Sequence, residues 1–235
     1  MQQEHIFKQF DADLEAVRSR VMQMGGLVEE QIAKGIESLS NGDLRLADEV
    51  IANDHLVNAL EVGIDEDCTH IIARRQPTAG DLRIVLMIIK TITDLERIGD
   101  EATKIARMAK LIHNSDRLTL PRFNEIKLMS SMVLQMLRKS LDAFARLEVS
   151  AAAQIARQDM QVDEEFRATL RRLITFMMED PRTISVSIDI LFVAKAIERM
   201  GDHAKNMSEY VVYMVKGKDV RHTSVEEIER EASDE

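Results

Sequence analysis

The sequence predicts an all-α protein made of two pseudo-symmetric three-helix bundles, six long antiparallel helices in all, that arose by internal duplication. Aromatic residues make up only 4 % of the chain and Trp is absent, whereas Met occurs 14 times. This mixture suits helix packing better than β-strands, which favour aromatic and β-branched residues. Three prolines and nine glycines in 235 residues are too few for many tight turns. In addition, one acidic sequence pattern occurs twice, once in each half of the chain.

Turn-forming residues divide the chain into six segments of roughly 27–35 residues, which as helices would be about 40–50 Å long. In the second of these turns Asp81 is placed to cap the helix that follows. Because the turns between long helices are short, we expect successive helices to be antiparallel. The turns are SNGD (40–43), RRQPTAGD (74–81), HNSDRLTLPR (113–122), RLEVS (146–150), MEDPRTIS (178–185) and KGKD (216–219).

The third helices of the two halves match each other. A proline precedes each of them, Pro77 and Pro181, and a shift of 102 residues aligns them without a gap. Their apolar residues then coincide except where Thr91 meets Val193, and the spacing alternates three and four, as in the seam of a bundle. This repeat predicts an internal duplication. The expected domains are residues 1–116, residues 117–216 and a mobile acidic C-terminal tail, 217–235.

Charge and composition exclude several classes of protein. The net charge of −10 argues against a general nucleic-acid binder, which needs a basic surface to displace counterions. The single Cys68 excludes an intramolecular disulfide and suits a reducing compartment. The N-terminus lacks the apolar stretch of a signal peptide, and no apolar run approaches the roughly 18–20 residues of a membrane span. We therefore expect a cytoplasmic protein.

The repeated pattern is LERIGD, which begins at Leu95, and IERMGD, which begins 102 residues later. Each copy places two acids four residues apart, Glu96 with Asp100 and Glu198 with Asp202, so each pair shares one helix face. With Leu95 at zero and about 100° per residue, the first pair lies near 100° and 140°, away from the apolar seam. We therefore expect both pairs to point away from their own bundle's core.

Two matched carboxylate pairs indicate metal sites formed by oxygen ligands. Such sites suit divalent or trivalent ions such as Mg, Mn, Ca or Fe rather than thiolate-preferring metals, and Zn stays open. The pairs could meet between the bundles or stay on separate surfaces. The alternative is a plain solvated face, because 41 of 235 residues are acidic. The neighbouring Arg97 and Arg199 are interpreted as exposed charge partners, or else as contacts for a partner protein.

A glycine lies inside each copy of the pattern, Gly99 and Gly201, although glycine in a helix costs about 1 kcal/mol relative to alanine. Either another backbone or a bulky ligand approaches closely there, or the glycine is simply inherited through duplication. His203 follows an acid of the motif directly and so points about 100° away from it, which makes it a poor co-ligand. Asp67 and His70 in DEDCTH are interpreted as a polar helix face.

Four segments of the chain, taken together and in their order along it, resemble the PhoU family, and the resemblance extends from about Phe10 to Lys216. It implies two symmetric three-helix bundles with a repeated (Glu/Asp)-x-x-x-Asp motif that binds metal, here Glu96 with Asp100 and Glu198 with Asp202. Acids on the preceding helices would complete the sites: Asp54, Glu61, Asp159 and Asp163. Asn58 of the first half matches Asp163 of the second, so the first half lacks one of these acids, and we do not expect equal metal binding in both halves. The segments are DHLVNALEVGI (54–64), ARRQPTAGDLR (73–83), DLERIGDEATKIA (94–106) and AIERMGDHAKN (196–206).

The resemblance also implies a function: negative regulation of the phosphate-starvation (Pho) response and modulation of phosphate uptake. Such a protein would be a non-enzymatic cytoplasmic adaptor between the ATPase subunit of a phosphate ABC transporter and a sensor histidine kinase. It would contact the membrane complex only peripherally. A homodimer is expected as well, since long exposed helices commonly associate. The alternatives are a metal-storage protein with outward acidic patches, and a metal-dependent enzyme, although the Glu-x-x-His pairs of a di-iron bundle are absent.

Overall fold

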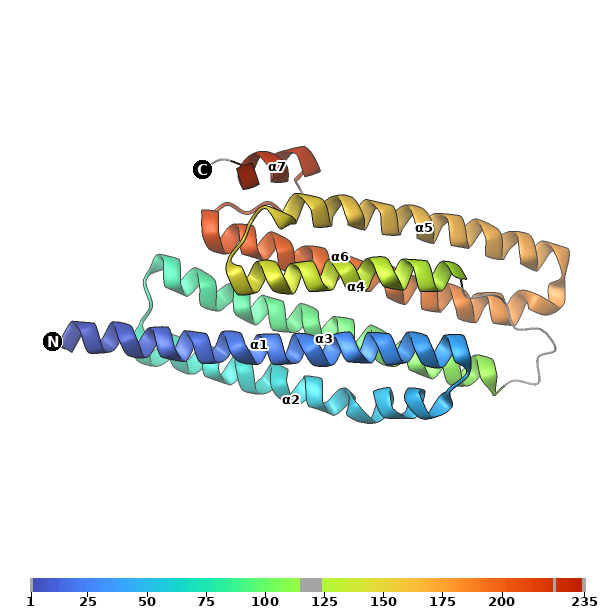
Figure 1. The fold of residues 1–235 in the computed structure, drawn as a ribbon, viewed down its shortest axis with the longest axis horizontal. Coiled ribbons are helices and arrows are strands. Elements are labelled where there is room, and N and C mark those ends of the chain that lie inside the picture. The colour runs from blue at the N-terminus through green and yellow to red at the C-terminus, as the bar shows by residue number, and fades with distance from the viewer. Residues whose placement is uncertain (1, 115–123, 222, 234–235) are drawn as a thin grey trace.

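The computed structural model describes residues 2–114, 124–221 and 223–233. Within these ranges every regular element is a helix, so the all-α prediction is confirmed. Figure 1 shows the long helices lying side by side along one axis. The elements are α1 (Gln2–Asn41), α2 (Leu44–Arg75), α3 (Ala79–His113), α4 (Asn124–Arg146), α5 (Ala151–Glu179), the short 3-10 helix η1 (Pro181–Thr183), α6 (Ile184–Lys216) and α7 (Val225–Ser233).

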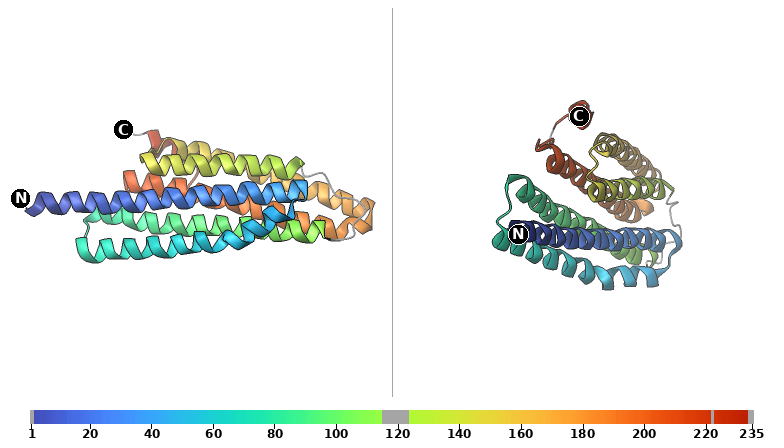
Figure 2. Two further views of the ribbon diagram at one scale, coloured as in Figure 1. Left: turned by 60° about the horizontal axis from the view of Figure 1, so that its bottom comes forward. Right: turned by 60° about the vertical axis from the view of Figure 1, so that its left-hand side comes forward.

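The helices form two bundles, α1–α3 and α4–α6, which lie against each other as two layers (Figure 2). The most extensive packing between any two helices joins α3 to α6, and α1 also contacts α4. The two helices that carry the acidic motifs are therefore central, each covered by its own bundle and by the other. Their seam residues are fully buried, as the alternating spacing predicts: Ile88, Leu95, Ile98 and Ile105 on α3, with Ile197, Met200 and Met207 on α6.

The ends of the helices follow from a few local residues. Asp43 caps α2, because its carboxylate accepts a hydrogen bond from the backbone N–H of Arg45. Gly217 ends α6 in the left-handed conformation with a φ of 72°. The expected cap of α3 needs a correction: Thr78 is the capping residue, and Asp81 lies inside the first turn. Thr78, directly after a proline, has extended backbone, so the helix starts before Asp81 is reached.

The predicted turns at 40–43, 146–150 and 178–185 separate helices as expected. The turn expected at 113–122 lies outside the described residues from residue 115 onward, and so does the boundary between residues 116 and 117. The limits of the two expected domains therefore stay predictions.

The segment expected to be a mobile tail contains the helix α7, and its mobility stays a prediction. Val220 and Ile228 are each 2 % exposed, because they pack against a patch of small residues. Figure 1 shows α7 lying over one end of α5. The acidic composition of the segment concealed two apolar residues, Val225 and Ile228, which are three positions apart and share one helix face. The patch consists of Ala152, Ala153 and Ala156 on α5 with Val212 on α6.

Candidate metal-binding surfaces

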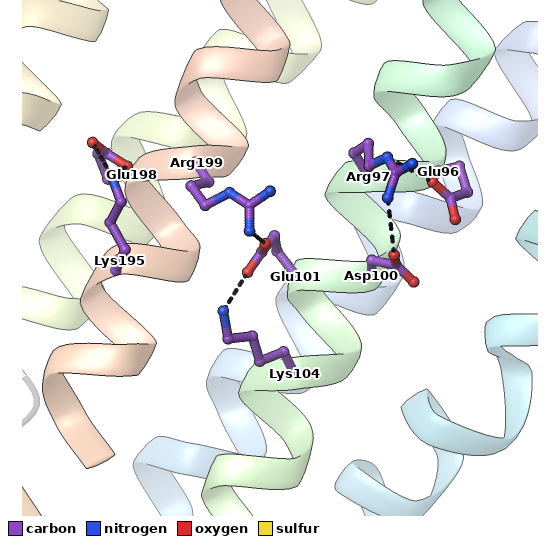
Figure 3. Close-up of polar contacts among 8 residues, drawn as sticks. All are labelled: Glu96, Arg97, Asp100, Glu101, Lys104, Lys195, Glu198 and Arg199. Atoms are coloured by element: carbon purple, nitrogen blue, oxygen red, sulfur yellow. Dashed lines mark hydrogen bonds and ion pairs between the residues drawn. The ribbon is translucent and has the colours of Figure 1, made fainter. Parts of the chain in front are cut away.

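The two acidic motifs lie on opposite sides of the contact between α3 and α6. Figure 3 shows Arg199 directed from α6 towards α3, whereas Glu198 lies beside Lys195 on another side of α6. Glu96 has acids of α2 among its electrostatic neighbours, and Asp202 has acids of α5. The motifs therefore form two separate surfaces, one between α2 and α3 and one between α5 and α6.

The expected outward direction of these acids holds only in part. The side chain of Asp100 is 48 % exposed, but those of Glu96 and Glu198 are only 17 % and 12 % exposed. A helix at the edge of a bundle would leave positions near 100° in solvent. Here the neighbouring helix of the same bundle covers that face, because α3 and α6 are central in the fold.

The first acidic surface consists of Asp54, Glu61, Glu96 and Asp100. Burial, and then the negative charge of Asp100, raises the pKa of Glu96 above its usual value. Burial also raises the pKa of Glu61, although the guanidinium of Arg97 opposes that change. Arg97 lies 3.5 Å from Glu96 and 4.0 Å from Asp100, so it is the exposed charge partner expected from the sequence. Among the described residues this single arginine is the only ion-pair partner of the four acids, and Asp54 and Glu61 form no ion pair.

The second acidic surface consists of Asp159, Asp163, Glu198 and Asp202, and its charges are better matched. Lys195 pairs with Glu198, the Nζ atom of Lys205 lies 2.8 Å from Asp159, and Arg167 lies 3.5 Å from Asp163. Burial, followed by the charges of Asp159 and Glu198, raises the pKa of Asp202 to about 6. Asp202 is the member of this surface that forms no ion pair within the described part of the chain.

One exchange between the repeats explains the difference between the surfaces. Thr103 donates a hydrogen bond of 2.9 Å to Asp54, and the matching residue of the second half, Lys205, forms an ion pair with Asp159. An ammonium group therefore takes the place of a hydroxyl group. Among the described residues, three cations form ion pairs within the second surface, whereas only Arg97 does so within the first, so the first surface has the greater need of a bound cation.

The donors of the first surface fit a hard metal ion that keeps part of its water. In the ranges that the structure describes, no three His, Cys, Asp or Glu side chains lie close enough together to hold an ion. Magnesium commonly binds proteins through only one or two carboxylates and retains several waters. Glu96 and Asp100, one helical turn apart on the same face, can supply such a pair.

Polar pairs across the contact between the bundles were not foreseen from the sequence. Arg199 is an exposed charge partner, as expected, but its partner is Glu101 of α3 in the other bundle rather than an acid of its own motif (Figure 3). The ring of His203 is hydrogen-bonded through Nδ1 to Asp94 of α3 at 2.6 Å. Asp94 and Glu101 are buried acids on the apolar side of α3. Acids at apolar helix positions are the signal that could have revealed this contact.

The two glycines make room for side chains of their own bundles. A Cβ atom added to Gly99 would lie 3.1 Å from Oε1 of Gln31, a buried residue of α1. A Cβ atom on Gly201 would lie 3.5 Å from Asp159 and from Val133, which is ordinary contact. Close approach thus accounts for Gly99, but the approaching group is a side chain rather than a backbone or a ligand. In DEDCTH, Asp67 pairs with Arg20 of α1, as suits a polar helix face.

The sequence model described as the PhoU domain matches residues 21–109 and 126–211, one stretch in each bundle. The chain belongs to the PhoU family. It is 46 % identical to the phosphate-specific transport system accessory protein PhoU of Escherichia coli K12. The aligned region of 226 residues covers 96 % of this chain and 93 % of that protein. A homolog of that protein from Pseudomonas putida is also 46 % identical, over 97 % of this chain and 88 % of its own length.

Solved structures of the family share the fold. The crystal structure of PhoU from Pseudomonas aeruginosa matches with a TM-score of 0.85 and 45 % identity, over 89 % of this chain and 100 % of that one. The PhoU structure from Streptococcus pneumoniae, a phosphate transport system regulatory protein, matches with a TM-score of 0.82 and 30 % identity, over 90 % and 99 % of the two chains. The duplicated fold predicted from the sequence is thus a property of the PhoU family.

Proposed function

We propose that this protein is a negative regulator of the phosphate-starvation response and a modulator of phosphate uptake. The observation that carries the proposal is identity of 46 % over 96 % of the chain with a protein named as an accessory of the phosphate-specific transport system. Two relatives and one solved structure with similar names support it.

In this proposal the protein is a cytoplasmic, non-enzymatic adaptor. Its partners are the ATPase subunit of a phosphate ABC transporter and a sensor histidine kinase, and it reaches the membrane only through that complex. None of the helices in the described part of the chain has the length and apolar character of a membrane span. The separation of the two acidic surfaces supports an adaptor, because one molecule could present a different surface to each partner.

We further propose that a divalent or trivalent metal ion binds at the acidic motifs, more tightly at Glu96 and Asp100 than at Glu198 and Asp202. The lysines of the second surface already neutralise part of its charge. When bound, the ion supplies positive charge, which lets an acidic surface approach acidic proteins or anionic lipid headgroups. The residues themselves hold the ion and leave room for its water. Mg, Mn, Ca, Fe and Zn are all candidates.

The experiment that tests the adaptor uses two paired variants, Glu96→Ala with Asp100→Ala, and Glu198→Ala with Asp202→Ala. Each is expressed in cells that lack the native gene, and a reporter of a phosphate-starvation gene is measured in phosphate-rich medium. We expect the empty control to be derepressed and the wild-type gene to restore repression. Failure of the wild-type gene to repress would overturn the regulatory function.

The same variants test the metal. Metal content and binding by calorimetry should fall more in the first variant than in the second, and binding of the ATPase subunit should fall with it. If metal content and partner binding are unchanged in both variants, the metal proposal fails while the adaptor stands. A storage protein would instead lose metal without any change in partner binding or repression. Storage is the second candidate, because separate two-carboxylate sites would hold hydrated ions loosely.

We also propose a homodimer. Large apolar side chains lie exposed near the turn between α5 and α6, where a second copy could cover them. Light scattering during size-exclusion chromatography measures the mass, and a monomer at micromolar concentration would refute the dimer. The exposed side chains are Ile174, Phe176, Met178, Ile184, Ile188 and Phe192.

A further inference from the structure

A cavity of about 530 Å³ lies between α5, α6 and the segment that follows α6. Its wall combines charged groups of α5 and α6 with apolar side chains, including Met160 of α5 and Val225 and Ile228 from α7. The described part of the first half has no equivalent. A shift of 102 residues places the exposed Arg107 opposite Glu209, and no segment like α7 follows α3 in the described residues. The cavity is therefore a feature of the second half alone.

The charges around this cavity do not balance. Lys205 is paired with Asp159 at 2.8 Å, and Arg221 is paired with Asp219, with 2.8 Å between Nε and Oδ1. Asp202 and Glu209 also line the cavity, but neither forms a hydrogen bond or an ion pair within the described part of the chain. After these two pairs are set aside, two carboxylates remain without a direct ion pair of their own in the described part of the chain, although Lys205 lies near both of them.

Glu209 is the residue that points to a ligand. It is only 6 % exposed, yet its carboxylate faces a cavity without any direct polar partner among the described residues. A largely buried carboxylate without a partner loses part of its hydration, and polar groups enclosed in this way are normally hydrogen-bonded in native proteins. A cationic group bound in the cavity would satisfy it.

The spacing of the two carboxylates selects the kind of cation. Asp202 and Glu209 are seven residues apart on α6, which is two turns or roughly 10 Å along the helix axis. A single metal ion would have to lie within about 2.6 Å of both carboxylates, which this spacing disfavours. Two ammonium groups joined by a short hydrocarbon chain match the spacing, and the apolar side chains of Met160, Val225 and Ile228 can cover that chain.

We propose that this cavity binds a short aliphatic diamine, with one ammonium group on Asp202, where it competes with the more weakly held metal ion, and the other on Glu209. The ligand is held by two charge-assisted hydrogen bonds, and Val225 and Ile228 of α7 close one side of the site over its methylene groups. Because α7 contributes to the wall, the bound diamine also ties the C-terminal helix to the second bundle.

The test is calorimetric titration of the full-length protein with putrescine in an amine-free buffer of low ionic strength. We expect one binding site per chain, and affinity at least about tenfold weaker in Glu209→Gln and in Asp202→Asn, since each variant loses one charged hydrogen bond. Butylamine, with a single ammonium group, should also bind at least about tenfold more weakly than putrescine. Glu164→Gln changes an exposed acid of α5 outside the cavity and should bind as the wild type does.

Three results would overturn the proposal: no binding of putrescine at millimolar concentration, unchanged affinity in Glu209→Gln, or equal affinity for butylamine. Titration with Mg²⁺ is the further control, and loss of magnesium binding in Glu209→Gln without any putrescine binding would show a metal site instead. If a variant does not fold by circular dichroism, hydrogen exchange of the wild type decides. Putrescine should slow exchange in residues 202–213 and 225–233, and no change there refutes the site.

Discussion

Replacing Glu209 by Gln should remove a strong dependence of stability on pH. Burial raises the pKa of Glu209 from the ordinary 4.5 to about 7, and Asp159 adds to the effect, while Lys205 opposes it. Beyond α6, Arg221 lowers this pKa and Asp219 raises it. Glutamine keeps the size of the side chain and removes its charge.

The sign follows from the protons bound in each state. Between pH 4.5 and about 7 the folded protein holds a proton on Glu209 that the unfolded chain has released, so the free energy of unfolding falls as pH rises through this window. The shift from 4.5 to about 7 corresponds to about 3 kcal/mol, at about 1.4 kcal/mol per pKa unit. Relative to the wild type, Glu209→Gln should therefore gain about 3 kcal/mol between pH 4.5 and pH 8.

Urea unfolding at several pH values measures this difference. Wild type, Glu209→Gln and the surface control Glu164→Gln are unfolded in amine-free buffers from pH 4.5 to 8, and the free energies are compared at each pH. Comparing across pH cancels any constant effect of the amide on packing. The quantity that decides is the difference in free energy of unfolding between wild type and Glu209→Gln. If this difference changes by less than about 0.5 kcal/mol between pH 4.5 and 8, the raised pKa is refuted, because a change of that size is within the usual effect of a surface substitution.

Two further predictions concern the contact between the bundles and the motif glycines. Arg199→Ala should lower the free energy of unfolding by about 2 kcal/mol, because the buried carboxylate of Glu101 loses one of its two charge partners and keeps only Lys104. The exposed Arg97→Ala should change it by less than about 1 kcal/mol, and equal losses in the two variants would contradict the assigned pairing. Gly99→Ala should be destabilising by urea unfolding, because a buried side chain must move, whereas Gly201→Ala should gain up to about 1 kcal/mol from helix propensity. If Gly201→Ala were less stable than Gly99→Ala, the contacts around the two glycines would not determine the effect of these substitutions.

The acidic motifs show how far the sequence reaches into the candidate site. The shift of 102 residues identified the matching acids, and the spacing of four residues placed each pair on one helix face. Helical angles alone could not show that α2 covers Glu96, because they describe one helix and not its neighbours. The same limit hid Glu101, which lies on the apolar side of α3 and meets Arg199 of the other bundle.

The C-terminal segment shows a second limit. Its acidic composition predicted a mobile tail and did not reveal that Ile228 packs against a patch of alanines on α5, more than seventy positions earlier in the chain. A helix of nine residues gains most of its stability from such packing rather than from its own propensity. The cavity with Glu209 depends on that docking, because Val225 and Ile228 form part of its wall.

The sequence by itself determined the helices, their turns, the duplication and the family, because these depend on residue type and on spacing along one chain. It also fixed which acids share a helix face. Only the tertiary structure decided that the two acidic surfaces point apart, that Lys205 neutralises part of the charge of one of them, and that Glu209 is buried beside a cavity. Those properties depend on which residues of other helices lie near each group, and burial and charge act through space rather than along the chain.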